Sequence, residues 1–300
     1  MTPWNTHILH GEHIGSLVIR THLLSGHKRY QATAMALGID GNMTLKAQEF
    51  NSTSLYESMA NYMPPMSPER IASSHSPAAL WALSYESSND AKWCPLDLNT
   101  NQQRLGGSVL SFNRSWHFCE HCTSEDIHRY GFSYWHTAHQ LPAITHCYIH
   151  KTPLRTCTSQ LRDLRLVTLP QTFVEKHMSQ YRDIDILSKW SEFVFDCFEA
   201  LKHSPDKAIA MRKAARDFLR LPTNARPHNK HQFENALAQL ETDIGPELLV
   251  HIFRSYANSQ LRKTNFLKMS LLNKKSANYK NPVSWLLILF WLRNKIDFSF

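Results

Sequence analysis

Two short cysteine and histidine motifs, separated by 24 residues, place the strongest constraint on how this chain can fold. Cys119 and Cys122 form a Cys-x-x-Cys pair, and Cys147 and His150 form a Cys-x-x-His pair. A two-residue gap lets both side chains of a tight turn reach one ion, so the two pairs predict a single tetrahedral zinc site. A closed Cys3His set leaves no position for water or substrate, and the ion is therefore expected to be structural.

The individual ligands are less firmly predicted than the cluster. Three further histidines lie beside these motifs, and each could replace one ligand: His117, His121 and His146. Ordinary buried cysteines near one of the chain's 18 histidines are the alternative, which the paired spacing disfavours. The remaining cysteines are interpreted as structural thiols: Cys94, Cys157 and Cys197.

Length and cysteine usage limit the class of protein. A chain of 300 residues can bury a substantial core in two or more compact units without disulfides. Three of the six cysteines have metal-binding spacing and the amino end does not resemble a signal peptide, which predicts a reducing, bacterial cytoplasmic location. The longest apolar run, residues 283–292, is about half of the ~20 residues a membrane span needs. It predicts a buried core helix and no membrane partner, with a partner-binding surface as the alternative.

Positive charge is concentrated in the second half of the chain. Residues 1–150 hold nine Lys/Arg and eleven Asp/Glu, a net −2, whereas residues 151–300 hold 24 and 14, a net +10. Residues 262–295 contain eight basic side chains and no acidic one, which predicts contact with phosphate backbones. A solvated cationic face is the alternative. The candidate contacts are Lys263, Lys268, Lys274, Lys275 and Lys280.

The hydrophobic pattern predicts a mainly α protein with three domains. Residues 1–105 form a helical region, 106–158 the zinc-finger module, and 159–300 a basic α-helical domain. Apolar spacing predicts short helices over residues 14–24 and 29–39, a pair compatible with a helix-turn-helix. Later helices are expected at 184–201, 208–219, 230–241 and 246–257, and irregular connections at 61–78 and 84–104.

The segment around the metal-binding pairs resembles the TniQ/TnsD family, whose members select target sites for Tn-type transposons. The family pattern combines Cys-x-x-Cys, an acid, Tyr-Gly, an aromatic pair, His-Gln-Leu-Pro and Cys-x-x-His. The matches are Cys119 and Cys122, Asp126, Tyr130-Gly131, Tyr134-Trp135, His139-Gln140-Leu141-Pro142, and Cys147 with His150. Departures from residues common in the family, none of them a ligand, are Glu120, Tyr148 and Lys151.

Two weaker matches flank this motif. Glu12, Ser16 and Arg20 resemble an amino-terminal helix of the family, which a glycine such as Gly26 ends. Residues 274–292 resemble a basic segment of TnsD-like members in which His-Pro stands where this chain has Asn-Pro. The resemblance thus spans most of the chain, although only its central motif is specific.

The resemblance implies a non-catalytic adaptor that links a recognised target to the AAA+ ATPase TnsC. TnsD-like members bind attachment-site DNA directly, whereas some TniQ members join an RNA-guided CRISPR effector. The basic second half favours direct contact with DNA, and the short length fits the effector-bound type. We take the DNA-contacting adaptor as the leading expectation and leave a homodimer open.

Two functions from other classes compete with the adaptor. Abundant histidine and the acid pair Glu125-Asp126 would suit a zinc-dependent nuclease, but catalysis needs an open metal position that a four-ligand set does not leave. Asp126 is instead interpreted as a helix-start carboxylate or one that supports a metal ligand. A zinc-bearing transcriptional regulator could use the same basic surface, and only the family resemblance disfavours it.

Overall fold

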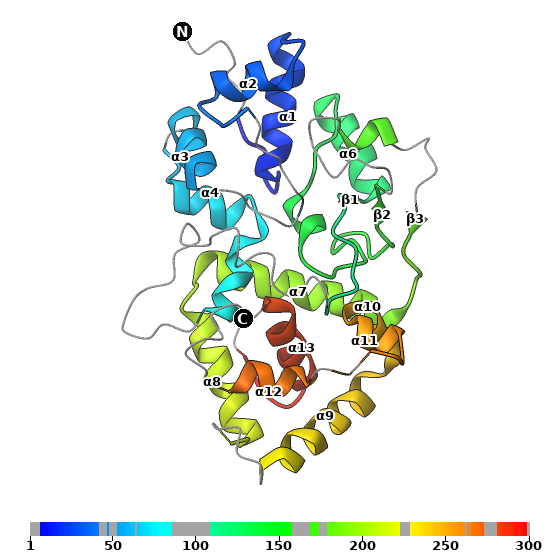
Figure 1. The fold of residues 1–300 in the computed structure, drawn as a ribbon. Coiled ribbons are helices and arrows are strands. Elements are labelled where there is room, and N and C mark those ends of the chain that lie inside the picture. The colour runs from blue at the N-terminus through cyan, green and yellow to red at the C-terminus, as the bar shows by residue number, and fades with distance from the viewer. Residues whose placement is uncertain are drawn as a thin grey trace. The chain divides into compact units, whose positions relative to one another are not determined.

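The computed structural model describes residues 7–41, 47, 53–63, 65–85, 109–157, 169–173, 179–222, 229–261, 263, 265–272 and 281–298, and within them it is mainly helical (Figure 1). This confirms the predicted fold class. The described residues form two compact units, unit 1 within 1–79 and 114–195 and unit 2 within 80–113 and 196–300. The predicted boundaries at 105 and 158 fall next to or inside stretches outside the described residues, so they stay predictions.

Unit 1 begins with the predicted pair of short helices, α1 (Ile14–Ser25) and α2 (Tyr30–Ala36). The Nδ1 atom of His13 accepts a hydrogen bond from the Gly15 N–H at 3.1 Å and caps the start of α1. Gly26, with a φ of 69°, ends it in the left-handed conformation that glycine adopts without steric cost. The two helices pack together, and the helix-turn-helix interpretation of this pair stays a prediction.

The predicted irregular connection at residues 61–78 is partly wrong, because the structure has a helix there. α3 (Thr53–Tyr62) is followed by α4 (Pro68–Ser74) and by the 3-10 helix η1 (Pro77–Ser84). The Ser67 hydroxyl accepts from the Arg70 N–H at 3.3 Å, and Pro68 lies in the first turn, where its missing N–H costs nothing. Pro68 therefore marks the start of a helix and not an irregular connection. Most of the second expected connection, residues 86–104, lies outside the described residues.

The two candidate metal-binding pairs lie in a small module of unit 1. Its elements are β1 (His117–Phe118), α6 (Glu120–Tyr130), the 3-10 helices η3 (Thr137–Gln140) and η5 (Pro170–Phe173), β2 (Arg155–Thr156) and β3 (Ser179–Gln180). The strands form an antiparallel sheet in the order β1-β2-β3, with His117 opposite Thr156 and Arg155 opposite Gln180. Under it, the buried rings of Trp116 and Trp135 lie 5.2 Å apart. This aromatic pair forms the core on which the motif folds.

Unit 2 is built around a helix with no polar face. α7 (Asp185–His203) runs from unit 1 into unit 2, which continues with α8 (Lys207–Leu219), α9 (Lys230–Ile244), α10 (Pro246–Ile252), α11 (Arg254–Ala257), α12 (Phe266–Leu271) and α13 (Pro282–Leu292). α13 packs against α8, α9 and α12, and all its residues except Ser284 are buried. The predicted core helix is thus confirmed. Among the described residues, no helix is long and apolar enough to cross a bilayer.

The helix predicted over residues 246–257 is interrupted at one position. Phe253 is extended, with φ −121° and ψ 128°, and separates α10 from α11. It forms a bridge with Leu110, while the Ser111 N–H donates to the Ile252 carbonyl at 2.9 Å. A distant segment therefore takes backbone groups that a continuous helix would have used, which local periodicity cannot reveal.

Candidate metal centre and basic groove

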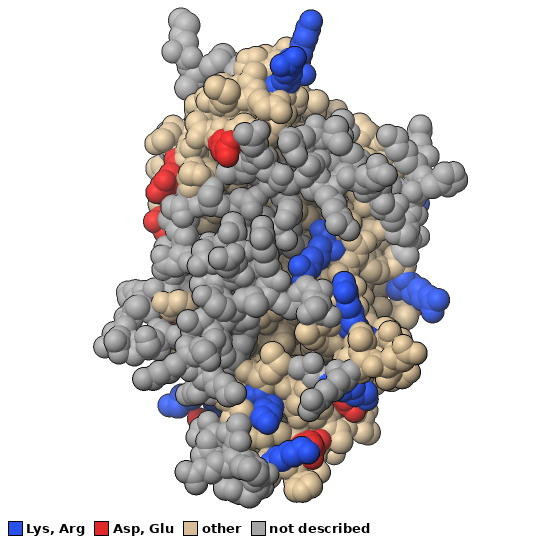
Figure 2. All heavy atoms as spheres, in the orientation of Figure 1, with Lys and Arg blue, Asp and Glu red and all other residues tan. Residues whose placement is uncertain are grey.

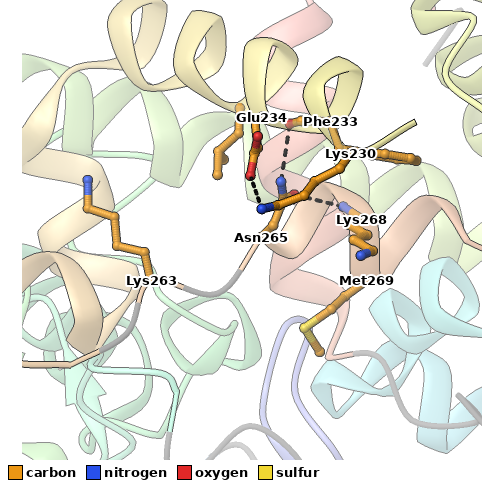
Figure 3. A pocket seen from close by; sticks show the side chains of 8 residues that line it. Lys230, Phe233, Glu234, Lys263, Asn265, Lys268 and Met269 are labelled. Carbon is orange, nitrogen blue, oxygen red and sulfur yellow. Dashed lines mark hydrogen bonds and ion pairs between the residues drawn. The ribbon is translucent and has the colours of Figure 1, made fainter. Parts of the chain in front are cut away.

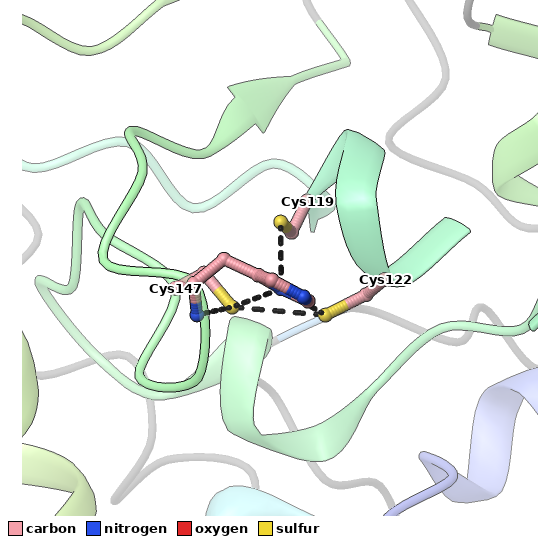
Figure 4. A group of neighbouring side chains, drawn as sticks. Cys119, Cys122 and Cys147 are labelled. Atoms are coloured by element: carbon pink, nitrogen blue, oxygen red, sulfur yellow. Dashed lines mark hydrogen bonds between the residues drawn. The ribbon is translucent and has the colours of Figure 1, made fainter. Parts of the chain in front are cut away.

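The four predicted metal ligands converge on one point, although they come from two separate turns (Figure 4). Cys119 immediately precedes α6 and Cys122 lies in its first turn. Cys147 and His150 lie in a turn that closes when the Lys151 N–H donates to the Cys147 carbonyl at 2.9 Å. The ligand atoms all lie within 4.8 Å of one another, so the cluster could hold a metal ion.

The spacing of the donor atoms fits a tetrahedral zinc site. The Nδ1 atom of His150 lies 3.6, 3.3 and 3.7 Å from the Sγ atoms of Cys119, Cys122 and Cys147, and the last two sulfurs are 3.6 Å apart. Zn–S bonds of about 2.3 Å and Zn–N bonds of about 2.0–2.1 Å require tetrahedron edges of roughly 3.5–3.8 Å. Three thiols and one imidazole at these separations form a donor set that suits zinc.

His150 is oriented by an acidic residue that the sequence interpretation did not link to a ligand. Its Nε2 atom lies 3.0 Å from the Glu125 Oε1 atom, which fixes a proton on Nε2 and leaves the Nδ1 lone pair directed at the sulfurs. The Glu125 side chain is 66% exposed. Glu125 on α6, rather than Asp126, is therefore the carboxylate that supports a ligand.

The three neighbouring thiols together stabilise one thiolate even without a metal ion. Hydrogen bonds from Cys122 and Cys147 hold the pKa of Cys119 far below its ordinary value. Hydrogen bonds with Cys119 and Cys147 raise the pKa of Cys122, and the hydrogen bond with Cys119 raises that of Cys147 to about 11. A metal ion would remove this competition because it coordinates all three sulfurs as thiolates.

The three alternative histidines lie outside the cluster, two of them bonded elsewhere. The Nε2 atom of His117 lies 3.1 Å from the Tyr181 hydroxyl, and His146 contacts Thr145 and Asp183 at 2.8 and 3.3 Å. The ring of His121 lies 5.2 Å from that of His150. A fourth histidine, His139, is buried with its Nε2 atom 3.8 Å from the Cys122 Sγ atom. Burial and the neighbouring His136 keep the pKa of His139 well below its ordinary value, so the ring is neutral.

Polar residues of the central motif hold the module together. The His136 Nε2 atom lies 2.8 Å from an Asp126 carboxylate oxygen. The Gln140 side chain accepts from the His117 N–H at 3.0 Å and donates to the His117 carbonyl at 2.8 Å, which makes it a substitute strand partner for β1. The Trp190 indole N–H donates to the Ala143 carbonyl at 2.9 Å. These side chains are occupied by structural bonds, which argues against a catalytic role for them.

The amino-terminal residues Glu12, Ser16 and Arg20 attach α1 to this module. The Glu12 carboxylate and Arg20 guanidinium form a bidentate ion pair, with N–O distances of 2.9 and 2.8 Å, and both residues are buried. The Ser16 hydroxyl accepts from the Trp135 N–H at 3.0 Å, and the His13 N–H donates to the Trp135 carbonyl at 2.8 Å. These residues, which lie at helical spacing in the sequence, therefore help to hold α1 against the module.

The predicted phosphate contacts separate into two groups. Lys274, Lys275 and Lys280 lie outside the described residues. The Nζ atom of Lys263 lies 3.6 Å from a Glu241 carboxylate oxygen and 4.7 Å from the centre of the Tyr256 ring, so its charge is partly compensated. Lys268 is half-buried on α12. Figure 2 shows Lys and Arg side chains at several separate places on the face drawn, some with Asp or Glu beside them.

Lys268 lies in a groove of about 640 Å³ formed by α9 and the segment that leads into α12 (Figure 3). The groove also contains Lys230, which no sequence feature had distinguished from other surface lysines. Lys263 stands at one end of it. The lining is completed by Phe233, Glu234, Leu237, Asn265 and Met269.

Comparison with known proteins links the metal cluster to a family. The TniQ family model matches residues 3–154, about half of the chain, and this range contains all four candidate ligands. It also contains Glu12, Ser16 and Arg20. A search of curated proteins found no match.

Proposed function

This chain belongs to the TniQ family, and from that premise we propose that it is a non-catalytic adaptor that selects target sites for a transposon. In this proposal a structural zinc ion holds the central module, basic side chains contact the target DNA, and a further surface recruits the AAA+ ATPase TnsC. The lysines expected at the phosphates are Lys263, Lys268, Lys274, Lys275 and Lys280.

The observation that carries the proposal is the closed donor set inside the family-matched region. Three cysteines and one histidine with near-tetrahedral separations leave no coordination position for water or substrate. The Glu125 carboxylate bonds the candidate ligand His150 rather than facing an open position. Zinc would supply binding energy for folding here, and the arrangement gives it no reacting atom to polarise.

The proposal is tested by purifying the metal-loaded protein together with a TnsC-type ATPase and ATP, with and without DNA. We expect one zinc per chain, co-elution with the ATPase, and enrichment of a defined nucleic acid. Recovery of one chromosomal DNA site would support direct target contact, whereas short guide RNAs would assign the chain to an RNA-guided effector. Metal-dependent cleavage of plasmid DNA by the purified protein would contradict an adaptor and support the nuclease.

A further inference from the structure

The groove between α9 and α12 holds a cation that lacks an acidic partner within the described part of the chain. Lys268 is half-buried on the groove wall and forms no ion pair there. Burial of an ammonium group is unfavourable without a compensating charge. The acid in the groove, Glu234, lies 3.5 Å from Lys230 instead. The groove therefore has a net positive charge and a recessed position suited to an anion.

Lys230 can turn towards such an anion at little cost. Its contact with Glu234 is an i,i+4 pair on the exposed side of α9, with the two side chains 69% and 47% exposed. Exposed pairs of this kind contribute little to stability. Lys263 differs from Lys230, because it is held between Glu241 and the Tyr256 ring. Two lysines, one on each wall, are thus available to a ligand.

Among the described residues that line the groove, the one side-chain amide is held in place by two hydrogen bonds to the backbone. The Asn265 amide donates to the Phe233 carbonyl at 3.1 Å, and its oxygen accepts from the Lys268 N–H at 2.9 Å. Asn265, the uncharged polar side chain among the described lining residues, is therefore held by these bonds, and the second of them caps α12. The other uncharged side chains are apolar: Phe233, Leu237 and Met269. Sequence readout requires matched donors and acceptors, whereas lysines contact phosphate as point charges.

We infer that this groove binds the sugar–phosphate backbone of a nucleic acid independently of base sequence, with Lys230 and Lys268 as its phosphate contacts. The inference rests on the proposed function and deepens it, since it adds Lys230 and assigns the groove to positioning rather than to target choice. An acidic peptide would also carry negative charge. A polymer with regularly repeated charge is favoured because the basic sequence without acids, residues 262–295, extends on both sides of α12.

The test compares the salt dependence of DNA binding by the full metal-loaded chain and its variants. Fluorescence anisotropy would follow two duplexes of equal length and unrelated sequence. The double variant Lys230→Gln, Lys268→Gln keeps most of each aliphatic stem and removes both charges. We expect the slope of log K against log salt to become shallower by about two, and affinity to fall equally for both duplexes. Lys189→Gln, a matched exposed lysine on α7 paired with Asp185 at 2.7 Å, should behave like the wild type.

The outcomes separate this inference from the function on which it rests. If the wild type binds DNA and the double variant has the same slope of log K against log salt, the groove is not the binding site. The proposal of a DNA-contacting adaptor would then still stand. Loss of binding to only one of the duplexes would overturn backbone recognition and indicate base reading. If the wild-type protein binds neither duplex, direct DNA contact fails together with the groove.

Discussion

The two units reach stability by different routes. Unit 1 buries many polar and charged groups, and among them Glu12, Arg20, Asp126 and Gln140 bond specific partners around the metal cluster. Unit 2 instead wraps helices around α13, whose buried positions are almost all apolar. Specific bonds tolerate little substitution, whereas an apolar core depends mainly on volume. Unit 1 should therefore fail through loss of one partner, and unit 2 through loss of packing.

Removal of two metal ligands should have the largest effect. Cys119→Ser, Cys122→Ser is expected to abolish zinc binding and unfold unit 1, because structural zinc in small modules supplies about 10–16 kcal/mol. Elemental analysis and hydrogen exchange would locate the loss. Cys157→Ser is the control, since Cys157 is buried in unit 1 but does not belong to the cluster. If the amides of unit 1 stay protected from hydrogen exchange in the double variant, unit 1 does not depend on single partners in the way proposed above.

Truncation of the unit 2 core should come next. Trp285 on α13 is fully buried, and Trp285→Ala should lower the free energy of unfolding by about 3–5 kcal/mol. Zinc content should stay unchanged, because the cluster belongs to unit 1. Denaturant unfolding with parallel metal analysis measures both quantities. Met269→Ala, at a 54% exposed position of the same unit, should change stability little. If the folded Trp285→Ala variant loses zinc, zinc binding by unit 1 depends on the packing of unit 2.

A smaller effect is expected from the carboxylate that orients His150. Glu125→Gln weakens the hydrogen bond to Nε2 without removing a ligand, and partners of this type change metal affinity about 10–100-fold. Competition with a chromophoric chelator would measure the affinity. Glu120→Gln is the matched control on the same helix, because Glu120 pairs with Arg155 at 2.8 Å instead of with a ligand. Equal losses of metal affinity in the two variants would show that Glu125 acts only through its general negative charge.

The weakest expected effect is a pH dependence confined to unit 1. Burial, followed by the nearby His75, lowers the pKa of His13 to about 3. Between that value and the ordinary pKa of about 6.5, the unfolded state binds more protons, so stability is complete above the upper value and falls as the pH decreases below it.

His13→Asn keeps an N-cap acceptor for α1 and removes the titrating group. The loss of stability with acid, followed by denaturant unfolding from pH 7 to pH 4.5, should therefore be shallower by at most about 1.4 kcal/mol per pH unit. Acid release of metal occurs in both proteins and cancels in the difference. Identical pH profiles for the wild type and the variant would show that His13 does not contribute.

Local sequence patterns predicted the parts of the molecule that depend on near neighbours. The apolar spacing located α1, α7, α8, α9 and α13, and the two-residue gaps brought Cys119, Cys122, Cys147 and His150 together. For the helices, the sequence pattern and the element it predicts lie in the same short stretch of chain. For the cluster, cysteine and histidine at this spacing themselves indicate a shared metal site. The start of α4 was also encoded locally, by Ser67 and Pro68, but was interpreted as a connection.

Other features required contacts between distant segments. The break at Phe253 depends on Leu110, and the role of Ser16 depends on Trp135. No local period encodes such pairings. Likewise, the charge count could not distinguish Lys263, which is paired with an acid, from Lys268, which has no acidic partner among the described residues although both line the groove. The sequence predicted which chemistry is present, and the tertiary contacts determined which side chains remain available for it.

The position of α13 along the chain has a consequence for biosynthesis. The helices of unit 2 that pack against it, α8, α9 and α12, all precede it in sequence and leave the ribosome first. Until residues 282–292 emerge, the apolar faces of these helices lack α13 as a partner, whereas all four candidate metal ligands of unit 1 are already synthesised by residue 150. Translation therefore supplies the candidate ligand set early and leaves apolar surface of unit 2 exposed for longer, and such surface promotes aggregation.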